Sequence, residues 1–485
     1  MLPTSEKFDA ALRVVEKLRA ARYEAYLAGG CVRDLLLGRE PKDYDVATSA
    51  TPDAVLGLFK RTFAVGAHFG VVLVADGDED QAAGSEGSRG EKPVTEVATF
   101  RSDGVYSDGR HPDGVRYTRS AEEDVRRRDF TINGLLLDPL LFQDAGPSTT
   151  VAGATSAQDD KLRANQEKLR SAVIDYVGGL ADLDAGVVRA IGRPEQRFEE
   201  DRLRMLRGVR FAARFGFELE AGTAAATRAL AARIQAVSRE RVRDELTRML
   251  TEGRARRAFE LLDETGLLAE VLPEVARMKG VEQPPQFHPE GDVWVHTLLL
   301  LEQLEAGCAL TLAWGALLHD VGKPPTFRRA PDRIRFDGHV ETGVAMAADI
   351  CRRFRFSNDE TAQILALIEN HMRFMDAQRM KTSTLKRFFR LPEFEEHLEL
   401  HRMDCLAGNG NLEHWEYVRE RYLAMPEEAV RPRPLITGRE LIAAGYTPGA
   451  GFKEMLRAVE DAQLEGTIGT LEEALRLVRE RFPIK

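Results

Sequence analysis

The stretch from Tyr26 to Thr48 constrains the fold of this chain more than any other segment. Its pattern predicts a strand over 23–27, the turn Gly29-Gly30, a short helix over roughly 32–37, and a second strand over 43–47. Glycine lets the backbone turn sharply and approach a phosphate group closely. The segment therefore predicts a strand–turn–helix–strand unit whose turn can lie against a phosphate.

Two aspartates, Asp43 and Asp45, stand two positions apart in the second of these strands. We therefore expect both carboxylates on one face of the sheet. Adjacent carboxylates repel each other unless a cation lies between them, and such oxygen ligands suit Mg²⁺ bound together with substrate phosphates. An Asp-x-Asp pair alone is more often a solvated loop or turn, but here it shares one short segment with the double glycine and Arg33. The combination predicts nucleotidyl transfer.

Length and composition indicate a soluble protein of several domains. The chain has 485 residues, 43% of them hydrophobic and 30% charged, with four scattered cysteines and a net charge of −10. No apolar run is long enough to cross a membrane, and the start of the chain lacks the pattern of a signal peptide. We expect a cytoplasmic protein with reduced thiols and no membrane partner. The negative charge argues against a sequence-blind nucleic-acid coat, while local arginine clusters leave RNA binding open.

The hydrophobic pattern changes near residue 190. Strand and helix patterns alternate before it, and nearly every later segment has the helical period, including 198–215, 221–236, 239–250 and 255–265. We expect an α+β protein with an α/β head over 1–180, an all-helical neck and RNA-binding body over 181–280, a further helical domain over 281–425 and a helical tail over 426–485. Stretches near 76–93 and 145–170 are expected to be disordered insertions in the head.

A third carboxylate, Glu96, stands in a predicted strand over 94–100, on the same face as Val94, Ala98 and Phe100. A carboxylate on an otherwise apolar face needs a physical reason. One reason is an edge position open to water. The other, which we favour, is a third catalytic carboxylate beside Asp43 and Asp45.

The segment from Glu199 to Phe211 predicts a base-reading helix. Asp201 and Arg204 stand three apart and offer an acceptor and a forked donor, which can read the edge of a base. Gly208 leaves room for a flat group on that face, and Arg207 and Arg210 could reach phosphates. A solvated helix with ion pairs explains the same pattern when it is taken alone. The Asp-x-Asp strand favours the nucleotide pocket.

A third element, Arg126 to Asn133, places Arg127, Arg128, Asp129 and Asn133 close together. Arginines followed by Asp129 and Asn133 suit contacts to a triphosphate and a ribose. The simpler alternative is a basic turn that enters a strand.

These elements, in this order, resemble the motifs of the class II tRNA nucleotidyltransferases, the CCA-adding family that also includes bacterial poly(A) polymerases. The resemblance covers almost the whole chain. The residues that carry it are Gly29-Gly30-x-Val32-Arg33-Asp34, Asp43-x-Asp45, Arg127 to Asn133, the linker Asp175 to Leu180, Glu200-Asp201-x-x-Arg204, and Ser238 to Leu246. One departure is Gly134, where the family usually has alanine.

The resemblance implies a nucleotidyltransferase head of the polymerase β type. It also implies three partners, which are the tRNA acceptor end, CTP and ATP. Asp43 and Asp45 would hold two Mg²⁺ ions as cofactors, and Asp201 and Arg204 would pair with the incoming base. Nucleotide contacts are expected from Gly29, Gly30, Arg33, Arg127, Arg128, Asp129, Asn133, Arg207 and Arg210.

A histidine-aspartate set in the body resembles the HD-domain phosphohydrolases. The residues are His296, His319, Asp320, His339, His371 and Asp404. Histidine and carboxylate ligands suit a transition metal or Mg²⁺, so the resemblance implies a second divalent metal site in an HD domain over 281–425. Lone histidines are mostly structural, and it is the set in sequence order that favours a site.

Several functions stay open at this point. Beside full CCA addition, the chain could be the A-adding half of a split system or a poly(A) polymerase. Val65 to Gly70 resembles the CCA type, and Arg101 to Arg110 resembles the loop that A addition requires. An HD phosphohydrolase acting on RNA ends, with a head that merely binds nucleotide, is the alternative from another class. The intact Asp43 and Asp45 argue against it, and the oligomeric state stays open.

Overall fold

The computed structural model describes residues 5–63, 70–75, 93–103, 115–143, 164–286 and 288–484. The chain divides into two compact units, Met1–Glu245 with Leu261–Val271, and Leu246–Glu260 with Leu272–Lys485. Most of the two expected insertions, residues 64–69 and residues 104–114 lie outside the described residues. The part 164–170, which we expected to be disordered, is helical, so that boundary of the second insertion was wrong.

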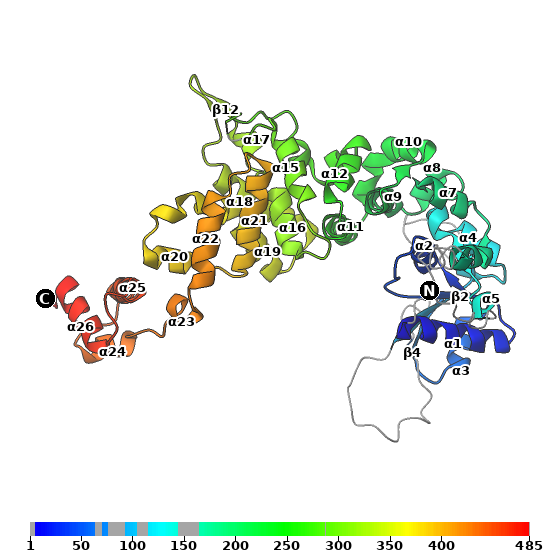
Figure 1. Cartoon of the computed structure of the whole chain (residues 1–485), viewed down its shortest axis with the longest axis horizontal. Coiled ribbons are helices and arrows are strands. Elements are labelled where there is room, and N and C mark those ends of the chain that lie inside the picture. The colour runs from blue at the N-terminus through cyan, green and yellow to red at the C-terminus, as the bar shows by residue number, and fades with distance from the viewer. Residues whose placement is uncertain are drawn as a thin grey trace, which may run out of the picture. The chain divides into compact units, whose positions relative to one another are not determined.

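The first unit is built on a mixed seven-stranded sheet with the order β3-β4-β5-β2-β1-β8-β9. Figure 1 labels two of its strands, β2 and β4. Strands β2 and β5 are parallel, and the other neighbours are antiparallel. The strands are β1 (Ala25–Ala28), β2 (Asp45–Thr48), β3 (Thr62–Phe63), β4 (Val71–Ala75), β5 (Val94–Thr99), β8 (Leu135–Leu137) and β9 (Val173–Asp175). Strand β5 therefore lies inside the sheet, so Glu96 is not on an edge strand, although its side chain is exposed.

Helices cover both faces of this sheet. Helices α1 (Glu6–Ala20) and α3 (Pro52–Leu58) pack on one face, and Ser5 and Thr51 cap their first turns. On the other face, α4 (Ala121–Arg126) contributes Ala121 and Val125 to a buried cluster with Ala28, Ala47, Phe100 and Leu136. The remaining short elements are α2 (Gly30–Leu36), α5 (Leu140–Gln143), η3 (Thr131–Asn133), α7 (Gly179–Ala185), β6 (Arg101–Asp103), β7 (Val115–Tyr117), β10 (Val187–Val188) and β11 (Glu218–Leu219).

Strand β2 begins at Asp45 and not at Asp43, so our expectation of both aspartates in one strand was wrong. The antiparallel partner β1 ends at Ala28, because the chain turns at Gly29 into α2. On that side, β1 therefore has no residue opposite Asp43. Asp43 lies in the loop before β2, and its exposed carboxylate is 3.0 Å from Lys7 Nζ.

The expected helix over 198–215 is two helices, α8 (Pro194–Glu200) and α9 (Leu203–Phe215). The break falls at Asp201, which has extended backbone and accepts a hydrogen bond on Oδ1 from the Leu203 amide at 3.1 Å. The apolar stripe of α9 is buried as expected, with Leu206 and Val209 fully inaccessible. The following helices are α10 (Ala221–Leu230), η4 (Ala231–Ala236), α11 (Arg239–Thr251), α12 (Ala255–Glu264) and α13 (Leu267–Val271).

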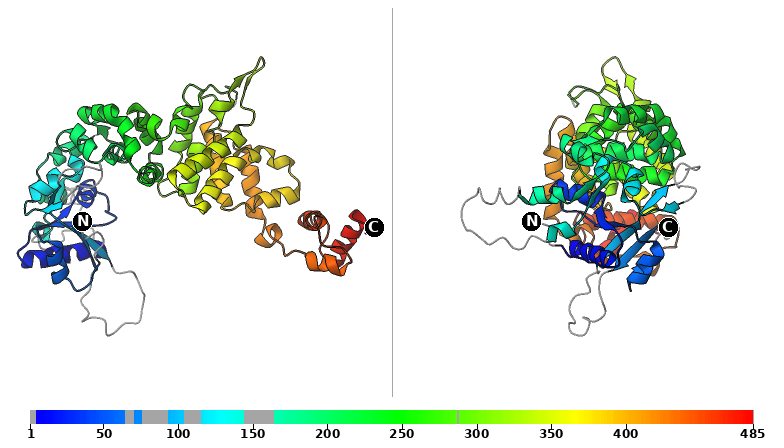
Figure 2. Two further views of the ribbon diagram at one scale, coloured as in Figure 1. Left: turned by 180° about the vertical axis from the view of Figure 1, so that it is seen from behind. Right: turned by 90° about the vertical axis from the view of Figure 1, so that its right-hand side faces the viewer.

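The second unit is almost entirely helical (Figure 2). A short hairpin, β12 (Arg328–Arg329) and β13 (Ile334–Arg335), accompanies its helices. They are α14 (Pro273–Ala276), α15 (Val293–Glu302), α16 (Leu310–Leu318), α17 (Lys323–Thr326), α18 (His339–Phe354), α19 (Asn358–Asn370), η5 (His371–Arg379), α20 (Thr382–Phe388), α21 (Phe394–Ala407), α22 (Glu413–Ala424), α23 (Glu427–Val430), α24 (Gly438–Ala443), α25 (Gly451–Leu464) and α26 (Leu471–Arg481). An α/β head followed by helices is the α+β class that the sequence predicts.

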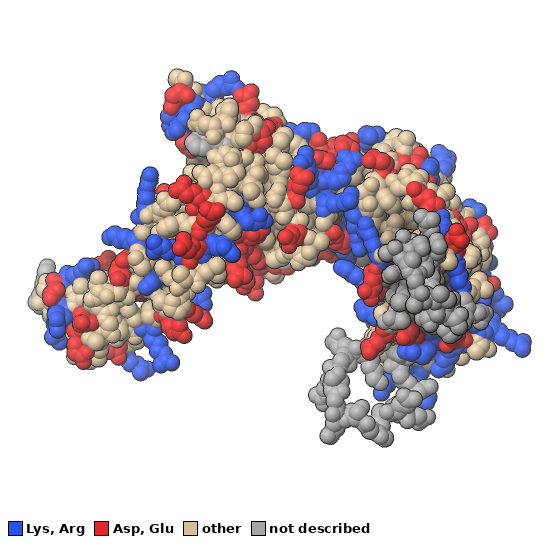
Figure 3. Space-filling model, viewed as in Figure 1, with Lys and Arg blue, Asp and Glu red and all other residues tan. Residues whose placement is uncertain are grey.

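Two clusters of aromatic and aliphatic side chains form cores in this unit. One is centred on Phe374, Phe388 and Phe394, and the other, near the C-terminus, is centred on Leu441 and Val459. None of the helices in the described residues has the length and hydropathy that a membrane span requires. On the face shown in Figure 3, positive and negative side chains are interspersed in both units, so the net negative charge does not form one acidic surface there.

Candidate active site and metal centre

A cavity of about 500 Å³ in the first unit brings the predicted nucleotide-binding residues together. It opens where the glycine turn after β1, the segment after α4 and the start of α9 meet. Its lining includes Asp45 and every residue we assigned to nucleotide binding except Arg210. These residues are Gly29, Gly30, Arg33, Arg127, Arg128, Asp129, Asn133, Asp201, Arg204 and Arg207, and they are joined by Leu203, Phe211 and Arg241.

Asp45 lines the cavity, and Glu96 lies beside it in the neighbouring strand. They are directly paired in the parallel register of β2 and β5. Burial, the nearby Glu96 and Asp43 raise the pKa of Asp45 to about 6, against the opposing effect of Arg128. Burial and Asp43 also raise the pKa of Glu96. The three carboxylates therefore sense one another, and a divalent cation between them would offset their repulsion.

The Gly29 turn has a conformation that other residues adopt at a cost. Its φ is +74°, and a Cβ built there would lie 2.9 Å from Arg128 Nη1. The Gly29 amide donates to the Leu135 carbonyl at 3.0 Å, which fixes the turn against the sheet. A side chain at residue 29 would therefore displace the end of Arg128 and strain the turn.

A chain of polar contacts links α2 to α9 along the cavity. Arg33 donates from Nη1 to Asn133 Oδ1 at 2.5 Å and from Nε to Asp34 Oδ1 at 2.9 Å. Asn133 Nδ2 donates to Asp129 Oδ1 at 3.1 Å, and Asp129 Oδ2 accepts from Arg207 Nε at 2.8 Å. Burial alone would raise the pKa of Asp129, but Arg207 and Asn133 outweigh it and lower the pKa to about 2. Asp129 is therefore a carboxylate that holds Arg207 in place.

Asp124 is a positioning residue that our sequence reasoning missed. Its buried carboxylate accepts from Arg127 Nε at 2.9 Å and from Arg128 Nη2 at 3.0 Å. These arginines outweigh the effect of burial and lower the pKa of Asp124. The signal was present, because Asp124 stands three and four residues before the two arginines.

The pair expected to read the base, Asp201 and Arg204, also lines the cavity. Arg204 donates to Glu200 Oε2 at 2.8 Å and to the Arg127 carbonyl at 3.1 Å, so its guanidinium is held from two sides. Asp201 Oδ2 is 2.9 Å from Arg241 Nη2. Arg241 lies within the stretch Ser238 to Leu246, but we had not assigned it to the site. Its contact with Asp201 places it there.

Two expectations about α9 are wrong. Gly208 does not leave room for a bound base, because a Cβ at that position would lie 3.1 Å from the Phe130 ring, which already fills the space. Arg210 does not reach the cavity. It is buried, and its Nε donates to the buried Glu245 at 2.7 Å. Arg210 lies on the side of α9 that faces α11, where its guanidinium pairs with Glu245.

Gly134, the departure from the family pattern, has a packing reason. A Cβ there would lie 2.8 Å from Val177 Cγ2 and 3.2 Å from both Ile191 Cδ1 and Val125 Cγ1. Neighbours this close exclude a side chain unless they shift.

The six residues expected at a second metal site come together in the second unit. His296 Nε2 lies 2.9 Å from Asp404 Oδ1, and His319 Nε2 lies 3.2 Å from Asp320 Oδ2. The possible ligand atoms of His296, His319 and Asp320 lie within 4.8 Å of one another, and so do those of Asp320, His339 and His371. Asp320 belongs to both groups, an arrangement that suits two adjacent cations.

The histidine rings of this site are held by their Nδ1 atoms. The Nδ1 atoms of His319, His339 and His371 lie 2.9, 3.0 and 2.6 Å from the carbonyl oxygens of Ala316, Phe336 and Ile368. Nδ1 then carries the hydrogen, and Nε2 offers its lone pair to the site. The buried Nε2 atoms of His319 and His339 have no hydrogen-bond partner among the described residues, which fits metal ligands.

The pKa values of two histidines in this centre shift in opposite directions. Burial and His319 lower the pKa of His371 to about 4. Burial would also lower the pKa of His296, but Asp404 and Glu290 outweigh it and raise the pKa to about 9. His371 is therefore neutral near pH 7, whereas Asp404 and Glu290 favour the protonated form of His296, and a bound cation would displace that proton.

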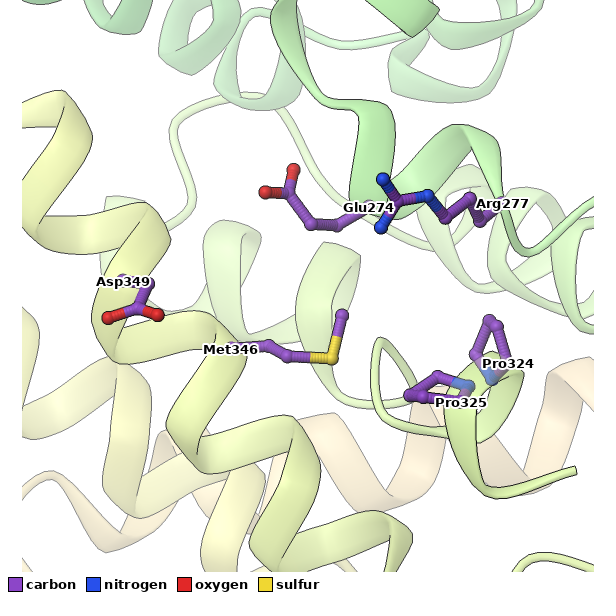
Figure 4. A pocket seen from close by; sticks show the side chains of 6 residues that line it. All are labelled: Glu274, Arg277, Pro324, Pro325, Met346 and Asp349. Carbon is purple, nitrogen blue, oxygen red and sulfur yellow. The ribbon is translucent and has the colours of Figure 1, made fainter.

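A second hollow in this unit, of about 460 Å³, has none of these ligands among its lining residues (Figure 4). Its walls are Glu274 and Arg277, the prolines 324 and 325 that follow Lys323, and Met346 and Asp349 of α18. Glu274 is already paired with Arg353 at 2.7 Å. We assign no chemistry to this hollow.

Three family models match the chain in succession. The poly A polymerase head domain matches residues 25–189, the probable RNA and SrmB-binding site of polymerase A matches 216–279, and the HD domain matches 293–407. The CCA-adding enzyme of Streptococcus thermophilus is 28% identical over 479 residues, which are 97% of this chain and 96% of that protein. The chain belongs to the family of CCA-adding enzymes and poly(A) polymerases.

One further relative matches a shorter stretch at higher identity, and a solved structure matches nearly the whole chain. The CCA-adding enzyme of Lactiplantibacillus plantarum is 39% identical over 244 residues, which are 50% of this chain and 49% of that protein. The crystal structure of the Bacillus stearothermophilus CCA-adding enzyme in complex with CTP has a TM-score of 0.68 and 24% identity, covering 99% of this chain and 98% of that chain. The likeness in fold therefore extends over both units.

Proposed function

We propose that this chain adds nucleotides to the 3′ end of tRNA without a nucleic-acid template, using CTP and ATP to build and repair the CCA end. One observation carries the proposal. Asp45 lines the same cavity as Asp201 and Arg204, the pair that we propose reads the base, and Glu96 is paired to Asp45 in the sheet. The full-length relative in Streptococcus thermophilus carries the name CCA-adding enzyme, which supports the proposal.

The carboxylates would hold Mg²⁺, which supplies activation of the RNA 3′-hydroxyl and stabilisation of the leaving pyrophosphate. Asp45 is anchored in β2, and Asp43 lies in the loop before it with only an exposed contact to Lys7. Because an exposed ion pair contributes little, Asp43 can turn from Lys7 toward Asp45. Glu96 is the third carboxylate at this position.

We propose that the other residues that line the cavity make two kinds of contact with the nucleotide. Arg127, Arg128 and Arg207 are held by Asp124 and Asp129 and present their remaining N–H groups to a triphosphate. Arg204 and Asp201 offer donors and an acceptor to the edge of the base. Gly29 and Gly30 give the phosphates close access to the backbone. Asn133 and Asp129 hold this set in place.

The domain assignment follows from this proposal. The head (1–180) performs the chemistry, the neck and body (181–280) read the base and contact RNA, and the HD domain (281–425) and tail (426–485) extend the contact with the tRNA acceptor end by shape and phosphate groups. The proposed tRNA substrate supports our expectation of a cytoplasmic protein.

The double substitution Asp43→Ala/Asp45→Ala tests the catalytic site. It should abolish incorporation of labelled CTP and ATP into a tRNA transcript that lacks CCA. Glu40→Ala removes an exposed carboxylate from the same loop and is the matched control. Incorporation that persists in the double variant would place the chemistry elsewhere.

Base selection has its own test. Arg204→Ala should reduce the preference for CTP and ATP over GTP and UTP by roughly 10- to 100-fold, because each good base contact contributes about 1–3 kcal/mol of discrimination. Competition between the four nucleotides on one transcript measures this preference. Arg202→Ala, which changes an arginine outside the cavity lining, is the control. An unchanged preference would contradict the role of Arg204.

A second activity is favoured by the HD residues. We propose a divalent-metal-dependent phosphohydrolase that acts on RNA ends, because His296, His319, Asp320, His339, His371 and Asp404 converge on one buried centre. An RNA with a 2′,3′-cyclic phosphate end, incubated with Mg²⁺, Mn²⁺ or Ni²⁺, should be hydrolysed by the chain and by Asp43→Ala/Asp45→Ala. Asp320→Ala should lose this activity, and equal hydrolysis by that variant would exclude the site.

A further inference from the structure

A short segment outside the HD family match reaches into the HD centre. The match covers 293–407, and the segment 281–291 precedes it. The segment folds back on itself, because the Gln283 amide donates to the Gly291 carbonyl at 2.8 Å and the Val293 amide donates to the Val281 carbonyl at 3.0 Å. This fold carries Glu290 and His288 to the ring of His296.

The contacts of Glu290 are short and buried. Its Oε1 lies 2.7 Å from His296 Nδ1 and 2.9 Å from His288 Nδ1. The Glu290 side chain is only 6% exposed and that of His296 is 0% exposed. The second carboxylate oxygen, Oε2, is buried and has no hydrogen-bond partner among the described residues. A buried carboxylate is costly unless it is paired and hydrogen-bonded, and here the two histidines supply that pairing.

These contacts decide which nitrogen of His296 can face the centre. A neutral imidazole has one N–H and one lone pair. When Nδ1–H donates to Glu290, the lone pair is on Nε2, which lies 2.9 Å from Asp404 Oδ1 and 4.0 Å from Asp320 Oδ2. The other three histidines of the set are held by backbone carbonyls. Among these four, His296 is held by a charged acceptor, which makes its Nε2 the more basic ligand.

We propose that Glu290 is a positioning residue of the HD metal centre, and that His288 fixes Glu290 from the opposite side. The proposal rests on the metal-dependent activity proposed for this domain. Glu290 selects the Nε2-ligating tautomer of His296 and orients its ring toward Asp320 and Asp404. The metal centre of this chain therefore includes a carboxylate–histidine pair contributed by the segment before α15.

The affinity of the chain for Mn²⁺ tests the positioning role of Glu290 and does not depend on measuring turnover. The full chain carrying Asp43→Ala/Asp45→Ala, which removes two carboxylates of the head, is stripped with a chelator and titrated with Mn²⁺ by calorimetry, and bound Mn²⁺ is counted by mass spectrometry. Glu290→Ala on this background should weaken Mn²⁺ binding about 10- to 100-fold with an unchanged number of ions. Glu290→Gln, which keeps an acceptor oxygen without the charge, should weaken binding less. His288→Ala should give a smaller loss of the same kind.

The controls separate this inference from the proposed activity. Glu282→Gln changes an exposed carboxylate of the same segment and should bind Mn²⁺ as the background does. Cooperative thermal unfolding shows that each variant is folded. Unchanged affinity in folded Glu290→Ala would overturn the positioning role alone, and so would loss of one whole ion in both Glu290→Ala and His288→Ala, because these residues would then be ligands of a separate cation. A background chain that binds no Mn²⁺ beyond Asp320→Ala would overturn the metal centre itself.

Discussion

Asp45 and Glu96 are paired directly across the parallel strands β2 and β5. Their carboxylates therefore act on the same space, and the pKa of each is raised. We predict that Glu96→Gln lowers kcat for CTP and ATP addition at least tenfold, since it removes one charge from the cation site. Single-turnover addition at several Mg²⁺ concentrations measures it, and a higher Mg²⁺ requirement is expected. Val94→Ala, a change at an exposed position in the same strand, should be silent. Equal loss in both variants would indicate damage to the strand.

Asp129 and Arg207 should behave as one unit. One oxygen of Asp129 accepts a hydrogen bond from Arg207 Nε at 2.8 Å and lies 2.6 Å from Arg207 Nη2 in an ion pair. Asp129→Ala frees Arg207 and should raise KM for both nucleotides, as Arg207→Ala does. Because the two side chains share a contact, the double variant should lose much less than the sum of the single losses. A double-variant cycle on kcat/KM measures this coupling, and strict additivity would show that Asp129 acts independently.

The buried pair Arg210–Glu245 should govern stability and not nucleotide binding. Arg210→Met leaves the Glu245 carboxylate buried without this partner, which should cost about 3–5 kcal/mol in the free energy of unfolding. Arg210→Met/Glu245→Leu should recover most of that loss. Chemical denaturation measures the free energies, and KM for CTP is measured at a temperature where all variants are folded. A large rise in KM with little loss of stability would restore the phosphate contact that the structure contradicts.

Acid should destabilise the second unit through His397. Its buried ring has no hydrogen-bond partner among the described residues, and burial together with Arg373 lowers its pKa to about 4. The folded chain therefore binds this proton less readily than the unfolded chain, whose His titrates near 6.5. The stability that this neutral His contributes is complete above about pH 6.5 and is lost as the pH falls toward 4, by roughly 1.4 kcal/mol per pH unit. His397→Leu should flatten the pH dependence of unfolding by that amount. An unchanged slope would contradict the prediction.

Much of the head could be predicted because its strands alternate. The pattern located β4 over Val71–Ala75 and put Glu96 in a strand. The start of β2 could not be predicted from the local pattern. It is set by the end of β1 at Ala28, which is a property of the pairing and not of the residues around Asp43.

The helices of the neck were harder to predict, because their breaks and ion pairs also depend on contacts that the local pattern does not contain. The apolar period runs through Asp201 without interruption, and the break there comes from a side-chain contact to the Leu203 amide. The partner of Arg210 is Glu245, on another helix, so no local pattern distinguishes this arginine from Arg207. In the second unit the HD residues could be found by their order. His288 and Glu290 could not, because they stand in an aperiodic segment rich in proline.

Extension of three tRNA transcripts tests the central claim most directly. One transcript lacks CCA, one ends in C-C, and one is complete. Each is incubated with the purified chain, Mg²⁺ and labelled CTP or ATP, and the products are sized at single-nucleotide resolution. The account predicts that the first grows to a full CCA end and stops, that the second gains one A, and that the third stays unchanged. Addition of A only to the C-C end, a long A ladder, or no addition to any transcript would contradict it.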